Sequence, residues 1–87
     1  MAAATVYLLR CADGTLYCGW TNDLDRRVAA HNAGRASRYT RSRRPVELAW
    51  SQPQPDRGTA MREEIRIKQL PRAAKLALVD RASPGGR

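Results

Sequence analysis

The sequence predicts a single α+β domain in which helices flank a three-stranded sheet, in the order ββαβαα. Three observations support this prediction: residues 5–20 are typical of two strands joined by a tight turn, residues 46–51 alternate apolar and polar side chains, and capping residues precede the helical segments. With 87 residues the chain has room for one hydrophobic core. We expect this domain to span residues 1–82 and residues 83–87 to form a flexible tail.

The first two predicted strands form an antiparallel hairpin. Residues 5–10 and 16–20 are rich in β-branched, aromatic and aliphatic side chains, which favour strands. Residues 11–15 connect them, and Gly14 can adopt the left-handed conformation that closes a three-residue loop with a bulge.

The length of the hairpin loop decides whether Tyr7 and Tyr17 share a face of the sheet. A loop of residues 12–14 places Tyr7 opposite Gly19 and directs both tyrosines to the same side, with an open gap at the glycine. A two-residue Asp-Gly turn would shift the register by one residue and place the tyrosines on opposite faces. The three-residue loop is the preferred interpretation.

A helix is predicted after the hairpin. Asn22 or Asp23 supplies its N-cap, and the helix runs to about Asn32. Gly34 follows as the C-terminal stop because glycine readily takes the left-handed conformation found there.

An arginine-rich loop and a third strand come next. Residues 35–44 contain five arginines and no acidic residue, and we expect them to form a loop that Pro45 ends. Residues 46–51 alternate apolar and polar residues, which predicts a strand with one buried face. Residues 52–55 are expected to be a short linker.

Two further helices complete the prediction. Asp56 can cap a helix that begins at Arg57 or Gly58 and ends at about Leu70. A last helix is expected over roughly residues 72–81.

The charge of the chain favours a polyanionic partner. Sixteen basic residues against eight acidic ones give a formal net charge of +8. Lys68 and Lys75 are the only lysines, so 14 of the 16 basic residues are arginines, whose planar guanidinium binds phosphate oxygens at two points. This composition predicts nucleic acid as the partner, the alternative being a merely soluble basic protein. A protein partner is possible but not indicated.

Cysteine usage and hydropathy restrict the compartment. Cys11 and Cys18 are too few for a disulfide framework, and the chain has no CxxC pair or histidine cluster that would indicate zinc. The start of the chain lacks the features of a signal peptide, and no stretch approaches the roughly 18 apolar residues of a membrane span. We therefore expect a reduced, soluble, cytoplasmic protein.

Five short motifs follow one another along the chain. They are Val6-Tyr7-Leu8, Tyr17-Cys18-Gly19, a helical segment from Asn22 to Asn32 that contains Arg27, the run from Tyr39 to Leu48, and a second helical segment from Ala60 to Lys68. With these motifs the chain resembles the GIY-YIG nuclease superfamily from Thr5 to about Val79. It is most similar to the small stand-alone bacterial members, the YhbQ-like group.

The resemblance implies a divalent-metal-dependent endonuclease that hydrolyses phosphodiester bonds in DNA, in preference to RNA, with Mg²⁺ or Mn²⁺ as cofactor. Glu64 is the implied metal ligand, and Glu63 is the alternative. A single carboxylate is sufficient because waters and substrate phosphate commonly complete the coordination of Mg²⁺. The alternative function is a basic nucleic-acid-binding module with weak or no cleavage. The presence of an acidic residue in a basic site favours the enzyme, since binding alone would not require it.

The remaining catalytic roles also follow from the resemblance. Arg27 would bind the scissile phosphate and offset the charge that builds on it. Tyr7 and Tyr17 would orient or deprotonate the attacking water, with Tyr7 ranked first as the base. A neighbouring Mg²⁺ and arginine would lower its phenol pKa from about 10. His31, one helical turn after Arg27, would assist proton removal or form a hydrogen bond at the helix end.

The arginine-rich segment is the predicted nucleic-acid surface. Its basic residues would follow the phosphate backbone, and Tyr39 would stack on a base or reach the catalytic site. The alternative is a solvated charge run. The arginines concerned are Arg35, Arg38, Arg41, Arg43 and Arg44.

Overall fold

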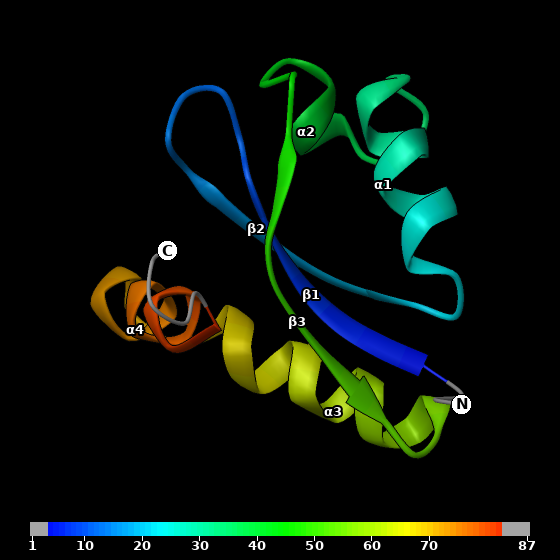
Figure 1. The fold of residues 1–87 in the computed structure, drawn as a ribbon, viewed down its shortest axis with the longest axis vertical. Helices are drawn as coiled ribbons and strands as arrows, with labels where there is room; N and C mark the ends of the chain where they lie inside the picture. The colour runs from blue at the N-terminus through cyan, green and yellow to red at the C-terminus, as the bar shows by residue number, and fades with distance from the viewer. Residues whose placement is uncertain (1–3, 83–87) are drawn as a thin grey trace.

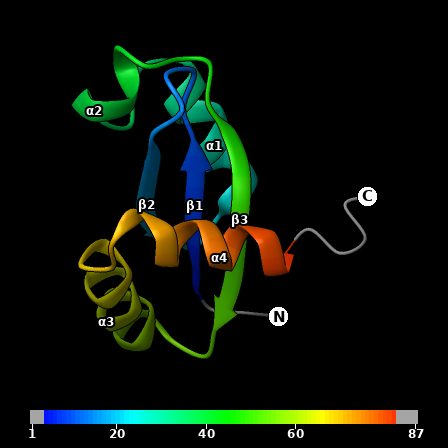
Figure 2. The same ribbon diagram turned by 90° about the vertical axis from the view of Figure 1, so that its left-hand side faces the viewer.

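A three-stranded antiparallel sheet with helices on both faces forms the centre of the computed structural model, which describes residues 4–82 (Figures 1 and 2). The strand order is β2-β1-β3, so the first strand is central. The predicted tail at 83–87 lies outside the described residues. The elements are β1 (Ala4–Arg10), β2 (Leu16–Thr21), α1 (Leu24–Asn32), α2 (Arg38–Arg41), β3 (Glu47–Gln54), α3 (Arg57–Lys68) and α4 (Arg72–Ala82).

The hairpin has the register that the three-residue loop predicts. Tyr7 pairs with Gly19, and Leu9 pairs with Tyr17. The Cys11 N–H donates to the Thr15 carbonyl at 2.9 Å, and Gly14 closes the loop with a φ of +86°. Both tyrosines therefore project from one face of the sheet.

The predicted helix caps are confirmed at both long helices for which a cap was named. The Asp23 carboxylate, not Asn22, accepts the Arg26 N–H at the start of α1, and Gly34 follows its end with a φ of +80°. The Asp56 carboxylate accepts the Thr59 N–H at the start of α3. This helix ends at Lys68, two residues before the predicted end.

The prediction that residues 35–44 form a loop is wrong for four of them. Residues Arg38–Arg41 form the short helix α2, whose N-cap Ser37 accepts the Tyr39 N–H. The run of arginines indicated solvated coil, but the serine cap satisfies a backbone donor locally and starts a helical turn. Thr40 of this turn is completely buried.

The third strand is longer than predicted, and the expected linker at 52–55 is wrong for three of its residues. β3 continues to Gln54 because β1 begins at Ala4, and these two residues pair. Pro53 is tolerated since β3 is an edge strand and its outer backbone groups need no partner in the sheet.

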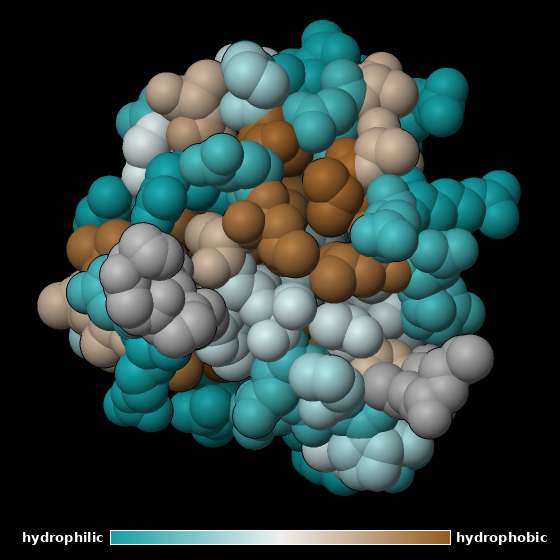
Figure 3. Space-filling view, viewed as in Figure 1, coloured by the Kyte–Doolittle hydropathy of each residue, from teal (hydrophilic) through white to brown (hydrophobic). Residues whose placement is uncertain are grey.

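The prediction of a single buried face on residues 46–51 also needs correction. The pairing of β1 with β3 shifts between Leu8 and Leu9, which pair with Trp50 and Leu48 respectively. Ala49 is the extra residue of this bulge, and the alternation breaks there. Ala49 and Trp50 pack against the same core cluster, whereas Leu48 is 44% exposed. Figure 3 shows apolar side chains gathered on the surface between β3 and α1.

Two core clusters lie on opposite faces of the sheet. Figure 2 shows α4 crossing one face and α1 behind the other. The cluster towards α3 and α4 is apolar, and Trp20 and Trp50 pack against it, as expected of core residues. It contains Ala4, Val6, Leu8, Cys18, Ala60, Ile67 and Val79. The cluster towards α1 contains Tyr7, Leu9, Cys11 and Val46.

Candidate active site

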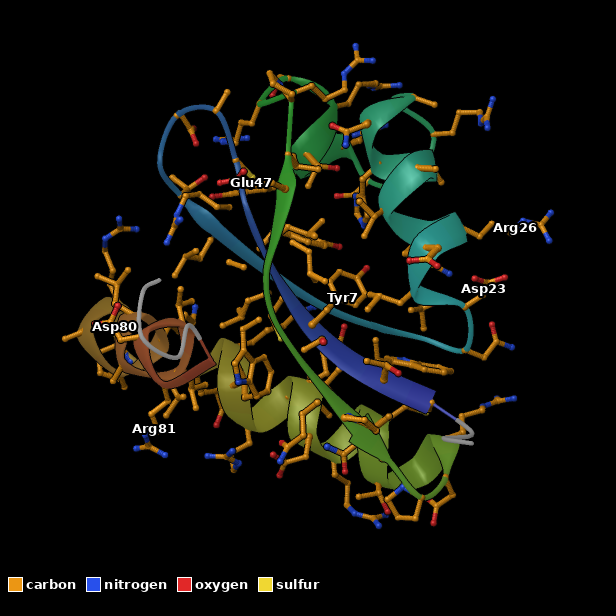
Figure 4. The ribbon with its side chains drawn as sticks, viewed as in Figure 1. Tyr7, Asp23, Arg26, Glu47, Asp80 and Arg81 are labelled. Atoms are coloured by element: carbon orange, nitrogen blue, oxygen red, sulfur yellow. The ribbon has the colours of Figure 1, made fainter. Side chains whose placement is uncertain are left out.

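Tyr7 occupies the gap that Gly19 leaves on the neighbouring strand. A Cβ atom built on Gly19 would lie 2.5 Å from the Tyr7 hydroxyl oxygen, so the phenol lies directly against the glycine backbone. Tyr7 is 1% exposed, and Figure 4 shows its side chain pointing from the sheet towards α1. The glycine thus makes room for a buried hydroxyl beside the helix that carries Arg27 and His31.

A hydrogen-bonded chain runs from the Tyr7 hydroxyl into the helices. The hydroxyl oxygen lies 3.0 Å from His31 Nε2, and His31 Nδ1 lies 2.7 Å from the Thr40 hydroxyl. Thr40 in turn donates to the Ser37 carbonyl at 3.4 Å. We therefore assign the Nδ1–H tautomer, in which the Tyr7 hydroxyl donates to Nε2.

Thr40 was missed as a site residue. Nothing in its sequence position distinguishes it, since it contributes only because α2 packs its hydroxyl against His31. The Ser37 cap starts α2, and the packing of this helix brings Thr40 next to the buried His31.

Burial sets the protonation states of this chain. It raises the pKa of Tyr7 to about 12, although the neighbouring Arg27 acts to lower it. Burial also lowers the pKa of His31 below its ordinary value of 6.5, and Arg27 lowers it further. The expected lowering of the phenol pKa by arginine is thus present but outweighed in the protein alone. Near neutral pH Tyr7 is a phenol that donates to a neutral imidazole.

Tyr17 and Tyr39 extend the aromatic surroundings of His31. The Tyr17 ring meets His31 edge-on at 5.3 Å between centroids and stacks on Tyr39 at 5.6 Å. The Arg43 guanidinium carbon lies 3.9 Å from the Tyr39 ring centroid. Tyr7 and Tyr17 therefore converge on one histidine, and Tyr39 reaches the site through Tyr17.

The two adjacent glutamates of α3 have different surroundings. Glu64 is close enough to Tyr7 to act on its pKa, and its side chain is 21% exposed. Glu63 forms an ion pair of 2.8 Å with Arg66 one turn along the helix, whereas the ion pair of Glu64 with Lys68 is longer, at 3.4 Å. Of the two glutamates, Glu64 is thus the one with the more loosely paired carboxylate, and it acts on the Tyr7 hydroxyl.

The donor set fits a hard divalent cation only when other oxygens complete its coordination. No group of three His, Cys, Asp or Glu side chains that could hold a metal occurs within residues 4–82. Glu64 offers one partly exposed carboxylate, whose charge acts on the Tyr7 hydroxyl. This is compatible with Mg²⁺ or Mn²⁺ bound by one carboxylate, waters and substrate phosphate.

Arg27 lies at the open side of the site. It lines a surface hollow of about 320 Å³ at the start of α1, together with Thr21, Asn22 and Arg26. Figure 4 shows Arg26, next to Arg27 in the sequence, extending away from the sheet into solvent. Arg27 thus lies between the buried Tyr7 and an accessible depression.

The predicted nucleic-acid arginines divide into two groups. Arg43 donates to the Asp13 carboxylate and the Tyr39 carbonyl, both at 2.9 Å, and Arg44 donates to the Arg41 and Asn32 carbonyls. The other three have exposed side chains for which no hydrogen bond or ion pair is found among the described residues. They are Arg35, Arg38 and Arg41.

These features place the chain in a known class of catalytic domain. The model of the GIY-YIG catalytic domain matches residues 3–77. The chain therefore belongs to the GIY-YIG family, which implies nuclease chemistry, and the predicted membership is confirmed.

Its relatives are small proteins called UPF0213. One from Nitratidesulfovibrio vulgaris is 56% identical over 81 residues, which cover 93% of this chain and 72% of the relative. One from Halobacterium salinarum is 53% identical over 73 residues, 84% of this chain and 95% of the relative. The solution NMR structure of a UPF0213 protein from Bacillus halodurans matches with a TM-score of 0.61 and 40% identity over 93% of this chain and 87% of that one.

These relatives are consistent with the predicted small stand-alone group, and the matched structure agrees with the predicted fold. Within residues 4–82 no helix is both long and apolar enough to cross a membrane.

Proposed function

We propose that this protein is a divalent-metal-dependent endonuclease that hydrolyses phosphodiester bonds in DNA. The observation that carries the proposal is the buried Tyr7–His31 hydrogen bond with Arg27 beside it, and with Glu64 near enough to act electrostatically on the Tyr7 hydroxyl. Phosphodiester hydrolysis needs a positioned water, neutralisation of phosphate charge and a stabilised leaving oxygen. These three side chains supply groups for the first two requirements.

Arg27 would hold the scissile phosphate. Its guanidinium lies beside Tyr7 and lines an open hollow, so a phosphate in that hollow would contact the same arginine that neighbours the phenol. Two parallel hydrogen bonds to phosphate oxygens would orient the phosphorus and offset the negative charge of the transition state. Mg²⁺ or Mn²⁺ held by Glu64 would supply further charge neutralisation when bound.

Tyr7 would orient the attacking water. Its O–H donates to His31 and its oxygen also accepts from Arg27, so one lone pair remains for a water that would enter from the Arg27 side. Because the pKa of the phenol lies far above that of the imidazole, proton transfer to His31 is strongly uphill in the protein alone. Positive charge beside the phenol would stabilise its phenolate and allow it to act as the base.

The nucleic-acid surface would extend from this site along α2. Arg35, Arg38 and Arg41 would contact phosphates, because their guanidinium groups are exposed. Arg43 and Arg44 would contribute after releasing their present hydrogen bonds, and a base would stack near Tyr39. The exposed arginines also favour the second candidate, a binding module with weak or no cleavage.

Cleavage assays with two adjacent glutamate variants test the enzyme proposal. Purified wild type, Glu64→Gln and Glu63→Gln are incubated with supercoiled, single-stranded and branched DNA and with RNA, in Mg²⁺, Mn²⁺ or chelator. We expect metal-dependent DNA cleavage that Glu64→Gln lowers on the order of a hundredfold or more, whereas Glu63→Gln retains it.

The same preparations distinguish the alternatives. Equal trace cleavage by wild type and Glu64→Gln would identify a contaminant and overturn the enzyme proposal. Binding that weakens steeply with salt, without cleavage, would establish the binding module instead. Cleavage confined to RNA would overturn the DNA assignment.

A further inference from the structure

The carboxylate of Glu64 already has a cationic partner on its own helix. Lys68 lies one turn along α3, and its Nζ atom is 3.4 Å from Glu64 Oε2. The glutamate side chain is 21% exposed and the lysine side chain 51% exposed. A metal cation that binds this carboxylate would therefore compete with the lysine ammonium.

The neighbouring ion pair on α3 shows how different this contact is. Arg66 donates to both oxygens of Glu63, at distances from 2.8 to 3.3 Å. Two-point contacts of a guanidinium are directional and hold one geometry. The Lys68 contact is a single long one, made by a flexible side chain that is half exposed, and such a pair exchanges at little cost.

Both lysines of the chain lie near Cys18. Lys68 and Lys75, from two different helices, act on the same buried thiol of Cys18, and so does Glu64. The Cys18 sulfur also lies 3.9 Å from the Glu64 backbone carbonyl. The other 14 basic residues are arginines, so Lys68 and Lys75 carry the only lysine ammonium groups of the chain.

We propose that Lys68 is a resident counter-ion of Glu64 that a divalent cation displaces, and that its freed ammonium then binds the substrate phosphate. The inference rests on the proposed function, since it takes Glu64 as the metal ligand. A divalent cation at the carboxylate repels the ammonium, and a bound phosphate beside the cation attracts it. Lys68 would therefore hold the carboxylate in place before the metal binds and contact substrate afterwards.

Titration with Mn²⁺ alone, followed by water-proton relaxation, tests the displacement. The proteins are wild type, Lys68→Gln, Glu64→Gln and the matched control Arg66→Gln, which breaks the neighbouring ion pair. Removing a competing surface ion pair should tighten Mn²⁺ binding by about two- to fivefold in Lys68→Gln. Arg66→Gln should bind as wild type, and Glu64→Gln should lose the site.

The outcomes separate the two proposals. If Glu64→Gln loses Mn²⁺ while Lys68→Gln binds it as wild type does, the displacement by metal is wrong and the metal site at Glu64 stands. If Glu64→Gln binds Mn²⁺ as wild type does, the metal is not held by Glu64, and the proposed function falls with the inference.

Binding of a phosphorothioate-linked DNA oligonucleotide, measured by fluorescence anisotropy, tests the second role. Lys68→Gln should bind as tightly as wild type in chelator and several-fold more weakly in saturating Mn²⁺. An equal loss under both conditions would make Lys68 an ordinary surface charge and overturn its release by metal. A thermal melt of each variant verifies that all remain folded.

Discussion

The two faces of the central strand β1 are equally well buried but differ in chemistry. Val6 and Leu8 point into an apolar cluster under α3 and α4, and both are 0% exposed. Tyr7, on the other face, is 1% exposed and shares its hydrogen bond with the buried His31. Buried polar groups are tolerated only when they are hydrogen-bonded. The first face thus stabilises the fold, while the second holds polar groups in position for chemistry.

The largest effect on stability is expected from the apolar face. Leu8→Ala removes a fully buried side chain and leaves a cavity, which should lower the free energy of unfolding by about 2–5 kcal/mol. Ile65→Ala, at a position that is 56% exposed, is the control and should change it by about 0.5 kcal/mol or less. Urea denaturation measures both. A loss below about 1 kcal/mol for Leu8→Ala would contradict the assignment of this face as the main source of stability.

An intermediate effect is expected where the polar face is most crowded. Gly19→Ala would place a methyl group 2.5 Å from the Tyr7 hydroxyl oxygen, so the phenol must shift and its hydrogen bond to His31 is disturbed. We expect a loss of about 1–3 kcal/mol in stability, and a loss of any cleavage activity beyond what unfolding explains.

Gly58→Ala is its matched control within α3. The nearest atom to the added Cβ is 3.5 Å away, an ordinary contact, and alanine there should be neutral or stabilise by up to about 1 kcal/mol. Wild-type activity in Gly19→Ala would show that the position of the phenol does not matter to the reaction.

The smallest effect concerns the protonation of His31. Its pKa is lowered in the folded protein, so the unfolded chain binds a proton first as the pH falls through about 6.5. Stability from this residue is therefore present above that pH and is lost progressively as the pH falls towards the folded pKa. Urea denaturation between pH 7 and 5 should show this decrease.

His31→Gln should abolish the slope in this interval, because His31 is the only histidine of the chain. The carboxylates with shifted pKa values lose their contribution only at lower pH. An unchanged slope in the variant would mean that another group titrates here.

Local signals in the sequence predicted the hairpin and the helix starts correctly. Gly14 and the preferred three-residue loop predicted that Tyr7 and Tyr17 share a face, because side chains alternate strictly along a strand. Asp23 and Asp56 marked the helix starts since an aspartate cap acts within three residues. Such features depend only on neighbours in the chain.

What the sequence could not predict depends on contacts between distant segments. The bulge at Ala49 arises from the pairing of β3 with β1, and Thr40 enters the site because α2 packs on α1. The arginine run likewise gave no sign that Arg43 would pair with Asp13 across 30 residues. A charged side chain has many equivalent partners in a sequence, and the fold selects one.

The small number of lysine side chains also has a practical consequence. Reagents and enzymes that acylate lysine neutralise an ammonium but leave a guanidinium intact. Lys68 and Lys75 are the only lysine side chains; both act on the buried Cys18, and Lys68 also pairs with Glu64. Acylation would therefore alter the charge around the carboxylate and spare the arginines along α2, which makes lysine modification a selective chemical probe of the site.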